Sequence, residues 1–283
     1  MLDPRYTVVL CDLWGCVHNG VAPFDGVREV LRQWKAEGRF IVFLTNAPRP
    51  AASVREQIEG LGIGEDCYDA IVSSGDAAIA WLQDRPVDTP RRFIGTARDR
   101  DALEAAGLSA GRAFAAGPAA GLAADPGGDI VCCGFAEGHQ DDLDHYRGPL
   151  EHAAAAGATL ICLNPDIEVE RGGTRELCAG AIAALFEEAG GKVVYFGKPH
   201  APIYDRALAK ARSGTGKAVE RAAIVAIGDN ARTDLRGADL YGLPFIYVAS
   251  GVGAGLNSPD TIQAQFGDTL DLVASVSSLA DLA

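Results

Sequence analysis

The sequence predicts an α/β protein built on a wound parallel sheet, and three observations lead to that class. Short apolar runs recur along the 283 residues, and amphipathic stretches of helical length lie between them. The apolar runs are nearly continuous, which is typical of parallel strands that are covered on both faces. The composition, 48% hydrophobic and 22% charged, is that of a globular chain long enough for one large domain or two smaller ones.

Each strand is predicted from an apolar run that ends in turn residues, and each helix from an amphipathic stretch between two runs. In chain order the strands are YTVVLCDL, RFIVFLTN, DAIVSSG, RRFIGT, DIVCCGF, TLICLNPD, KVVYFGKP, AAIVAIGDN and PFIYVASG. In chain order the helices are Val27–Glu37, Ala51–Leu61, Gly75–Leu82, Leu143–Ala156, Thr174–Ala189, Ala201–Arg212 and Asp234–Tyr241. This alternation of strand and helix indicates a parallel sheet with helical crossovers.

Charge and composition exclude several classes of protein. The formal net charge of −13 repels phosphate backbones, so nucleic acid is not an expected partner and any phosphate site needs local cations. No run of about 18 apolar residues occurs, so we expect no membrane span, and the start MLDPRYTVVLCDL does not resemble a signal peptide. The seven cysteines are odd in number and lack CxxC spacing, which favours a reducing, cytoplasmic location.

Polar residues stand at the ends of four predicted strands. They are Asp12, the pair Thr45–Asn46, Lys198 and Asp229. Ligands of wound parallel sheets bind beyond the carboxyl ends of the strands, so these side chains are expected at one site. A carboxylate able to act as a nucleophile, a hydroxyl, a cation and a second acid form a set suited to phosphoryl transfer.

Each of these residues also suits an ordinary structural role. Asp12 suits a turn after a strand, and Thr45–Asn46 suit a cap on the following helix. Lys198 precedes a proline and suits a surface loop. Asp229 and Asp234 suit a turn and a helix N-terminus, where the dipole favours acids. The occurrence of all of them in this order, each near a strand end, favours the functional interpretation.

Together the motifs resemble those of the haloacid dehalogenase superfamily of phosphohydrolases. DLWGC stands where that family has its nucleophile motif, DxDGT/V, and LTN is similar to its second motif. GKP supplies the family lysine, and GDNARTD matches the acidic motif GDxxxTD. The forms LTN, LNPD and GKPH are similar to the class IIA branch, which includes p-nitrophenyl phosphatases and sugar-phosphate and nucleotide phosphatases.

The resemblance implies a Rossmann-like core with an inserted α/β cap. The core would comprise residues 1–80 and 191–283, and residues 81–190 would form the cap that selects the substrate. Short linkers near Leu82–Arg85 and Gly190–Lys192 would act as hinges. Relatives in this branch often associate through the cap, which implies a homo-oligomer.

The loop LNPDIEVERGGTRE of the predicted cap carries many charges. By resemblance it faces the active site, with Asn164 and Asp166 in contact with the substrate. The alternative is a solvated charged loop followed by a helix start. Its other charged residues include Glu168, Glu170, Arg171 and Arg175.

The resemblance also implies catalytic roles. The Asp12 carboxylate would attack a phosphate ester of a small metabolite and form an aspartyl phosphate. Lys198 would neutralise the phosphoryl oxygens and hold Asp12 ionised among acidic neighbours. Thr45 and Asn46 would complete the phosphate site.

The several carboxylates require a cation, and their hard oxygen ligands indicate Mg²⁺. The predicted metal ligands are Asp12, Asp229 and the backbone carbonyl of Trp14. Asp234 is added to this set, acting through water or by orienting Lys198.

Trp14 departs from the family pattern, which has a second aspartate at that position. In the family this aspartate protonates the leaving group and later activates water. An indole cannot take up a proton, and general acid–base catalysis is typically worth about 10²–10⁴-fold. The departure predicts a slow phosphatase, a preference for acidic leaving groups, or a substitute proton donor, for which His18 and His200 are the candidates.

Two other functions remain as alternatives. The first is a catalytically weakened relative that binds a phosphorylated ligand or partner and has a regulatory role. The second is a dehydrogenase, which is disfavoured because GVGAG at 251–255 lacks GxGxxG spacing and stands near the end of the chain.

Overall fold

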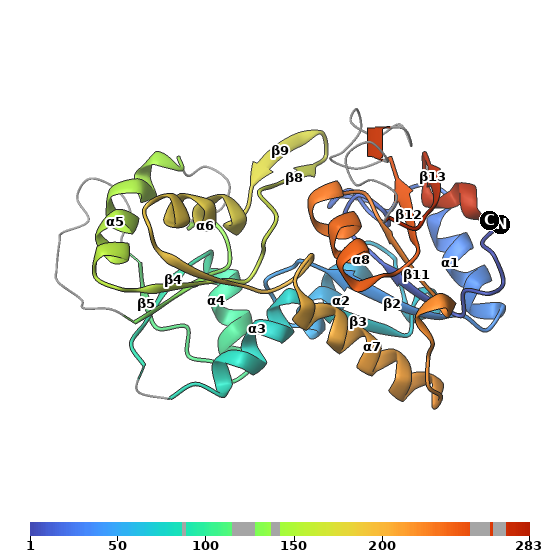
Figure 1. Ribbon diagram of the computed structural model, residues 1–283, viewed down its shortest axis with the longest axis horizontal. Helices are drawn as coiled ribbons and strands as arrows, with labels where there is room; N and C mark the ends of the chain where they lie inside the picture. Colours follow the sequence, from blue (N-terminus) through green and yellow to red (C-terminus); the bar gives the residue numbers. More distant parts are fainter. Residues whose placement is uncertain (87–88, 115–127, 137–141, 250–260, 263–269) are drawn as a thin grey trace.

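The computed structural model describes residues 1–86, 89–114, 128–136, 142–249, 261–262 and 270–283. The glycine-rich GVGAG segment at 251–255 lies outside these ranges. Two parallel sheets form the centres of two α/β units, which lie side by side along the long axis in Figure 1. The fold class predicted from the sequence is confirmed. The strands of both large sheets pair in parallel, and helices alternate with strands along the chain.

The first unit is built on a six-stranded sheet in the order β13-β12-β11-β1-β2-β3. Its strands are all parallel and comprise β1 (Val8–Cys11), β2 (Phe40–Thr45), β3 (Ala70–Ser73), β11 (Ile224–Gly228), β12 (Phe245–Val248) and β13 (Leu272–Val276). Every residue of β1, β11 and β12 is buried, as the continuous apolar runs predict.

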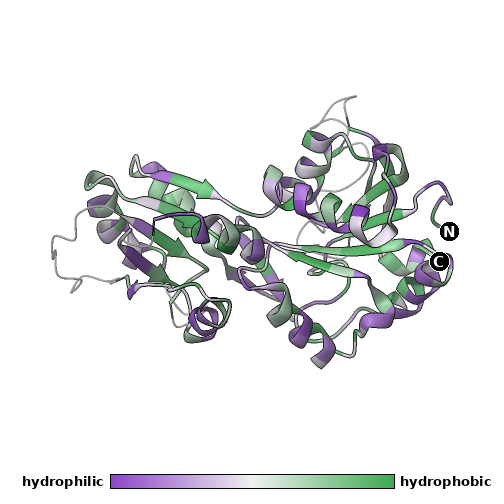
Figure 2. Cartoon of the chain, turned by 90° about the horizontal axis from the view of Figure 1, so that it is seen from below, coloured by the Kyte–Doolittle hydropathy of each residue, from purple (hydrophilic) through white to green (hydrophobic). Residues whose placement is uncertain are grey.

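Helices cover both faces of this sheet. One face packs on α1 (Val27–Ala36) and α2 (Ala51–Gly60), through side chains such as Leu31, Trp34 and Ile58. The other face packs on α7 (Ala201–Thr215) and α8 (Arg236–Tyr241), through Tyr204 and Ala238 among others. Figure 2 shows hydrophobic strands with helices of mixed polarity around them. The final segment, which has no assignment from sequence, supplies the edge strand β13 and the short helix Leu279–Leu282.

The second unit lies between α3 (Ser74–Gln83) and α7 in the chain. Its five-stranded sheet has the order β10-β7-β6-β4-β5, and the described part has a core of its own. The strands are β4 (Arg91–Ile94), β5 (Arg112–Ala113), β6 (Asp129–Cys132), β7 (Thr159–Cys162) and β10 (Lys192–Tyr195). The helices are α4 (Ala97–Ala105), α5 (Asp144–Ala155) and α6 (Ala179–Glu188).

The domain boundary predicted between residues 190 and 191 falls too early. Strand β10 pairs with β7, so residues 192–195 belong to the second sheet. The linker predicted at Gly190–Lys192 therefore lies inside the second unit, between α6 and β10. The chain returns to the first unit only after Tyr195, in the segment that carries Lys198.

A hairpin replaces the start of the helix predicted over 174–189. Strands β8 (Glu168–Arg171) and β9 (Thr174–Leu177) pair antiparallel, and the helix begins only at Ala179. The turn residues Gly172 and Gly173 have φ angles of 54° and 86°, which suit a two-residue hairpin turn that glycine favours. Cross-strand ion pairs then stabilise the hairpin, and the charged residues that suggested a helix start supply them.

Within the described ranges, the structure has no helix whose length and apolarity would let it cross a membrane.

Candidate active site

The polar residues predicted at strand ends meet at one edge of the six-stranded sheet. Asp12 directly follows β1, Thr45 ends β2, and Asp229 directly follows β11. Because β1 pairs in parallel with both other strands, their carboxyl ends are neighbours. Lys198 reaches the same edge from the segment that returns from the second unit. All four side chains are buried.

Lys198 lies between two carboxylates. Its Nζ is 2.6 Å from Oδ1 of Asp12 and 2.7 Å from Oδ1 of Asp234. Burial alone would lower the pKa of Lys198, but the charges of Asp12, Asp234 and Asp166 raise that pKa well above its usual value. The ammonium group therefore stays charged and fixes the position of the Asp12 carboxylate.

Burial is also the main influence on Asp12. It raises the pKa of Asp12 to about 7, with a further rise from Asp234 and an opposing effect from Lys198. The backbone N–H of Leu13 donates to Oδ1 of Asp12 at 2.7 Å and helps to orient the carboxylate. A bound cation would lower this pKa, because it favours the ionised form.

Asn46 joins the two units at the site. Its Oδ1 accepts from the backbone N–H of Lys198 at 2.7 Å, and its Nδ2 donates to Oδ1 of Asp166 at 3.0 Å. Asn164 in turn accepts from the backbone N–H of Asp166 at 3.1 Å. Burial raises the pKa of Asp166 to about 6, which keeps part of this carboxyl protonated in mildly acidic solution. Asn46 thus holds the lysine segment as well as facing the site.

The donors at this edge suit a hard divalent cation. Ligand atoms of Asp12, Asp229 and Cys16 lie within 4.8 Å of one another, and all three residues are buried. The Asp229 carboxylate lies against Gly15, where a Cβ would come within 2.2 Å of its Oδ2. Burial raises the pKa of the Cys16 thiol well above its usual value, which leaves the carboxylates as the natural ligands.

Both carboxylate oxygens of Asp234 have partners within the protein. Its Oδ1 pairs with Lys198, and its Oδ2 accepts from the backbone N–H of Asn230 at 3.2 Å. This geometry favours a role in orienting Lys198 over direct coordination of a metal. The carbonyl of Trp14 remains a predicted ligand.

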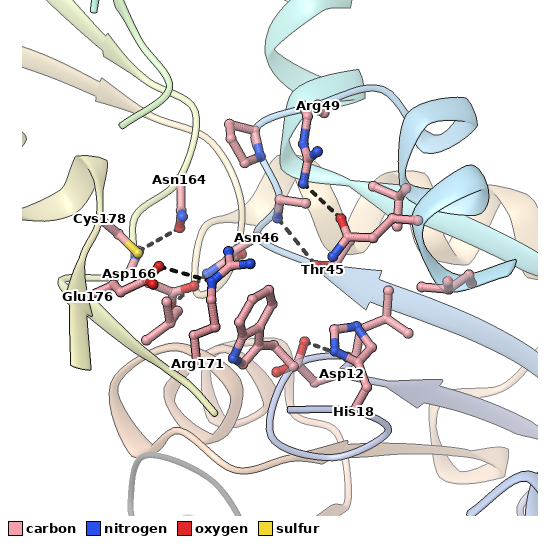
Figure 3. Close-up of a pocket in the computed structure, with 18 residues that line it drawn as sticks. Asp12, His18, Thr45, Asn46, Arg49, Asn164, Asp166, Arg171, Glu176 and Cys178 are labelled. Carbon is pink, nitrogen blue, oxygen red and sulfur yellow. Dashed lines mark hydrogen bonds and ion pairs between the residues drawn. The ribbon is translucent and has the colours of Figure 1, made fainter. Parts of the chain in front are cut away.

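A cavity of about 170 Å³ opens above Asp12 and receives side chains from both units (Figure 3). The first unit contributes Asp12, His18, Thr45, Asn46 and Arg49, and the second contributes Asn164, Asp166, Arg171, Glu176 and Cys178. The predicted substrate contacts Asn164 and Asp166 therefore lie in the same cavity as the predicted nucleophile. Arg49 and Glu176 also line this cavity, although the sequence did not indicate them as site residues. Arg49, between two prolines in NAPRP, has a position beside LTN that could have drawn attention.

Trp14 connects the loop after β1 to the hairpin of the second unit. Its Nε1–H donates to the backbone carbonyl of Glu170 at 2.7 Å. The guanidinium of Arg171 lies over the indole ring, with 5.0 Å from Cζ to the centroid. Nearby, the backbone N–H of Gly172 donates to the carbonyl of Asn19 at 3.3 Å. The residue at the family's acid–base position thus contacts the second unit with both its ring and its donor.

The two histidines predicted as substitute proton donors differ in location. His18 lines the cavity, and its Nδ1 accepts from the backbone N–H of Gly20 at 3.0 Å. Burial, together with the charge of Arg171, lowers the pKa of His18 to about 4, so the imidazole is neutral near pH 7. His200 is not among the residues that line this cavity and instead stacks on Tyr195, with ring centroids 5.1 Å apart.

Comparison with known proteins gives consistent matches. Residues 9–109 match a family model described as haloacid dehalogenase-like hydrolase, and residues 195–279 match a second model of HAD-like hydrolases. A solved hydrolase of the haloacid dehalogenase-like family from Brucella suis 1330 is 32% identical, covers 97% of this chain and 96% of its own, and superposes with a TM-score of 0.82.

Two curated proteins are similar at lower identity. The ribonucleotide monophosphatase NagD of Escherichia coli (strain K12) is 26% identical over 87% of this chain and 88% of its own length. The sugar-phosphatase AraL of Bacillus subtilis (strain 168) is 27% identical over 96% of this chain and 93% of its own length.

Proposed function

Because this chain belongs to the haloacid dehalogenase-like hydrolases, in their class IIA branch, we propose that it is a Mg²⁺-dependent phosphatase of a small phosphorylated metabolite. The second α/β unit is its cap. The observation that carries the proposal is the buried Asp12 carboxylate held at 2.6 Å by Lys198, beside Asp229 at the same sheet edge. The relatives named above are phosphatases, which supports this reaction class.

The residues of the site suit two successive displacements at phosphorus. Asp12 attacks the phosphate ester, a bond forms between its carboxylate oxygen and phosphorus, and the ester P–O bond breaks. The leaving alkoxide takes a proton from solvent. Water then attacks phosphorus and gives up a proton to solvent, the bond between Asp12 and phosphorus breaks, and inorganic phosphate is released. Lys198 and the Thr45 hydroxyl contact the phosphoryl oxygens. Mg²⁺, held by Asp12 and Asp229, would neutralise further negative charge on the transferring group.

Trp14 sets the expected preference for leaving groups. Its indole cannot protonate the departing oxygen, and its Nε1–H is used by the carbonyl of Glu170. His18 is a poor substitute near neutral pH, because its pKa of about 4 leaves no imidazolium to donate a proton. Esters with acidic leaving groups, which need no protonation, should therefore react faster than alkyl esters.

The test is Mg²⁺-dependent phosphate release from esters that range from p-nitrophenyl phosphate to alkyl sugar phosphates. Release should stop in Asp12→Asn and on chelation of the metal. It should continue in Asp101→Asn, which removes an exposed carboxylate on α4. Turnover that survives in Asp12→Asn would contradict the proposed nucleophile.

A second candidate is a binding protein with weakened catalysis, and the contacts of Trp14 are the observation that favours it. In that case no ester would release phosphate, while the protein would still bind inorganic phosphate in the presence of Mg²⁺. Phosphate release from the esters distinguishes the two candidates, and calorimetry with inorganic phosphate shows whether a protein without this activity still has a working binding site.

A further inference from the structure

Two arginines from different units line the cavity that contains Asp12. Arg49 belongs to the loop between β2 and α2 of the core, and Arg171 ends β8 in the cap hairpin. The proposed phosphate site already has a cation in Lys198 and the ligands for a metal ion. The arginines are therefore additional positive charge in a chain whose net charge is −13.

Arg49 has few partners for a buried cation. Its side chain is only 14% exposed, and its Nε lacks a hydrogen-bond partner among the residues that the structure describes. One terminal nitrogen donates to Gln57 at 2.8 Å. The nearest carboxylate is Asp99 at 3.8 Å, and that carboxylate already accepts from Thr96 at the start of α4. A buried donor without an acceptor is costly, which favours an acceptor supplied by a ligand.

Arg171 has a fixed position with donors to spare. Its guanidinium lies over Trp14, and its Nε pairs with Glu176 at 3.1 Å. The terminal nitrogens make no hydrogen bond within the part of the chain that the structure covers. A planar guanidinium held in this way can bind an anion through two parallel hydrogen bonds.

The two guanidinium groups also repel each other. Burial is the main cause that lowers the pKa of Arg49, and the charges of Arg98 and Arg171 lower it further. The acids that line the cavity are Asp12, Asp166 and Glu176, of which Asp12 pairs with Lys198 and Glu176 with Arg171. Asp166 accepts from Asn46. Each acid of the described lining therefore already has a partner other than Arg49.

We infer that the substrate carries a second anionic group, a carboxylate or another phosphate, that binds Arg49 and Arg171 while its phosphate ester lies at Asp12. This inference rests on the proposed function and specifies its substrate class. Because one arginine comes from the core and the other from the cap, such a substrate would contact both units at once. The second anion would also supply the acceptor that Arg49 Nε lacks.

Matched pairs of esters test the inference. 3-Phosphoglycerate and glycerol 3-phosphate differ by a carboxylate, and fructose 1,6-bisphosphate and fructose 6-phosphate differ by a phosphate. The wild-type kcat/KM should favour the member with the second anionic group in at least one pair by about tenfold or more, as expected for charge-assisted hydrogen bonds. The pair that shows the preference identifies the anion. A wild-type ratio near one in both pairs would overturn the inference.

Variants then assign the preference to the arginines. Arg49→Gln and Arg171→Gln should each reduce the ratio about tenfold, mainly through KM, and Arg49→Lys should restore part of it. Arg98→Gln is the matched control for Arg49→Gln, and Arg175→Gln is the matched control for Arg171→Gln. Both control arginines are exposed and lie outside the cavity lining. Arg98 is near Arg49 in space, and Arg175 is near Arg171 in the sequence. A wild-type ratio in either cavity variant that still folds would overturn the assignment to that arginine.

A binding experiment separates this inference from the proposed reaction. Calorimetry can compare 3-phosphonopropionate with propylphosphonate, which differ by the carboxylate and cannot be hydrolysed. Tighter binding of the carboxylate compound, lost in Arg171→Gln, would support the second anion site even in a protein that hydrolyses no ester. Equal binding of the two compounds, in a protein that does hydrolyse p-nitrophenyl phosphate, would reject the inference and leave the phosphatase intact.

Discussion

Two groups of polar residues at the candidate site differ in how completely they are paired. We call Asp12, Thr45, Lys198, Asp229 and Asp234 the phosphate floor, and Arg49 with Arg171 the arginine wall. On the floor, Lys198 meets its two carboxylates at 2.6 and 2.7 Å, and every residue is buried. On the wall, the nearest carboxylates stand at 3.1 and 3.8 Å, and donors remain unused. On the floor, Lys198 is fully paired with Asp12 and Asp234 before a substrate binds, whereas the wall keeps donors that a substrate could use.

The largest effect is expected when the ammonium group of Lys198 is removed from the phosphate floor. Lys198→Met would leave Asp12 and Asp234 buried without their shared partner, and loss of one partner of a buried pair costs about 3–5 kcal/mol. We expect a loss of that size in the free energy of unfolding, measured with urea, together with loss of phosphate release.

The control for this prediction is Arg55→Met, in the exposed pair Arg55–Glu65 at 2.9 Å. Exposed pairs contribute at most about 1 kcal/mol, so its unfolding should hardly change. If the two variants lost similar stability, the phosphate floor would be no more tightly organised than the surface.

The same contrast shows what could be predicted from sequence. The floor residues follow buried strands directly, and parallel strands bring their carboxyl ends to one edge, so Asp12, Thr45 and Asp229 could be placed without a structure. Lys198 is also predicted from the end of a strand, but that strand, β10, belongs to the second sheet. The motifs GKP and GDNARTD indicate Lys198 and Asp234 through the family resemblance. The strands themselves were equally accessible, because short continuous apolar runs between turn residues are typical of buried parallel strands.

The wall depends on contacts that no local pattern contains. Arg171 lies far from Trp14 in the sequence and reaches it only because Gly172 and Gly173 turn the hairpin back toward the core. The Gly-Gly pair is a hairpin signal, but the charges around it resembled a helix start. Arg49 has no periodicity that separates it from an ordinary surface arginine. Its nearest carboxylate, Asp99, belongs to α4, a helix that the sequence did not predict.

Trp14 lies two residues after Asp12 of the phosphate floor and contacts Arg171 of the arginine wall. Replacing it tests whether the missing acid–base group limits the reaction. In Trp14→Asp a carboxyl group occupies the position at which the family has its acid–base residue. We expect turnover of alkyl phosphates to rise by about 10²-fold relative to p-nitrophenyl phosphate, since general acid catalysis typically contributes about 10²–10⁴-fold. The ratio of kcat values for the two ester types is the measurement.

Trp14→Phe is the matched control for this change. It keeps an aromatic ring at this position but has a smaller ring system and lacks the donor to the carbonyl of Glu170. Its ratio of alkyl to aryl turnover should equal that of the wild type. An unchanged ratio in Trp14→Asp as well would mean that proton donation does not limit the reaction on alkyl esters.

The smallest effect comes from two glycines with almost the same backbone conformation. Gly20 and Gly38 have φ angles of 84° and 85°, so alanine should cost each about 1–2 kcal/mol of unfolding free energy through backbone strain. Only at Gly20 would the new Cβ meet another group, because Cζ2 of Trp14 would lie 2.5 Å away, while nothing lies within 4 Å at Gly38.

Any difference in substrate preference between Gly20→Ala and Gly38→Ala can therefore be attributed to a shift of the Trp14 ring. If that ring holds Arg171 in the arginine wall, Gly20→Ala should lower the preference for the ester with a second anionic group about threefold, a modest shift because the ring moves rather than disappears. Gly38→Ala should keep the wild-type preference, and both variants should keep Asp12-dependent phosphate release. Equal preferences in the two alanine variants would show that Arg171 is positioned by Glu176 alone, and the wall would then be independent of the loop that carries the nucleophile.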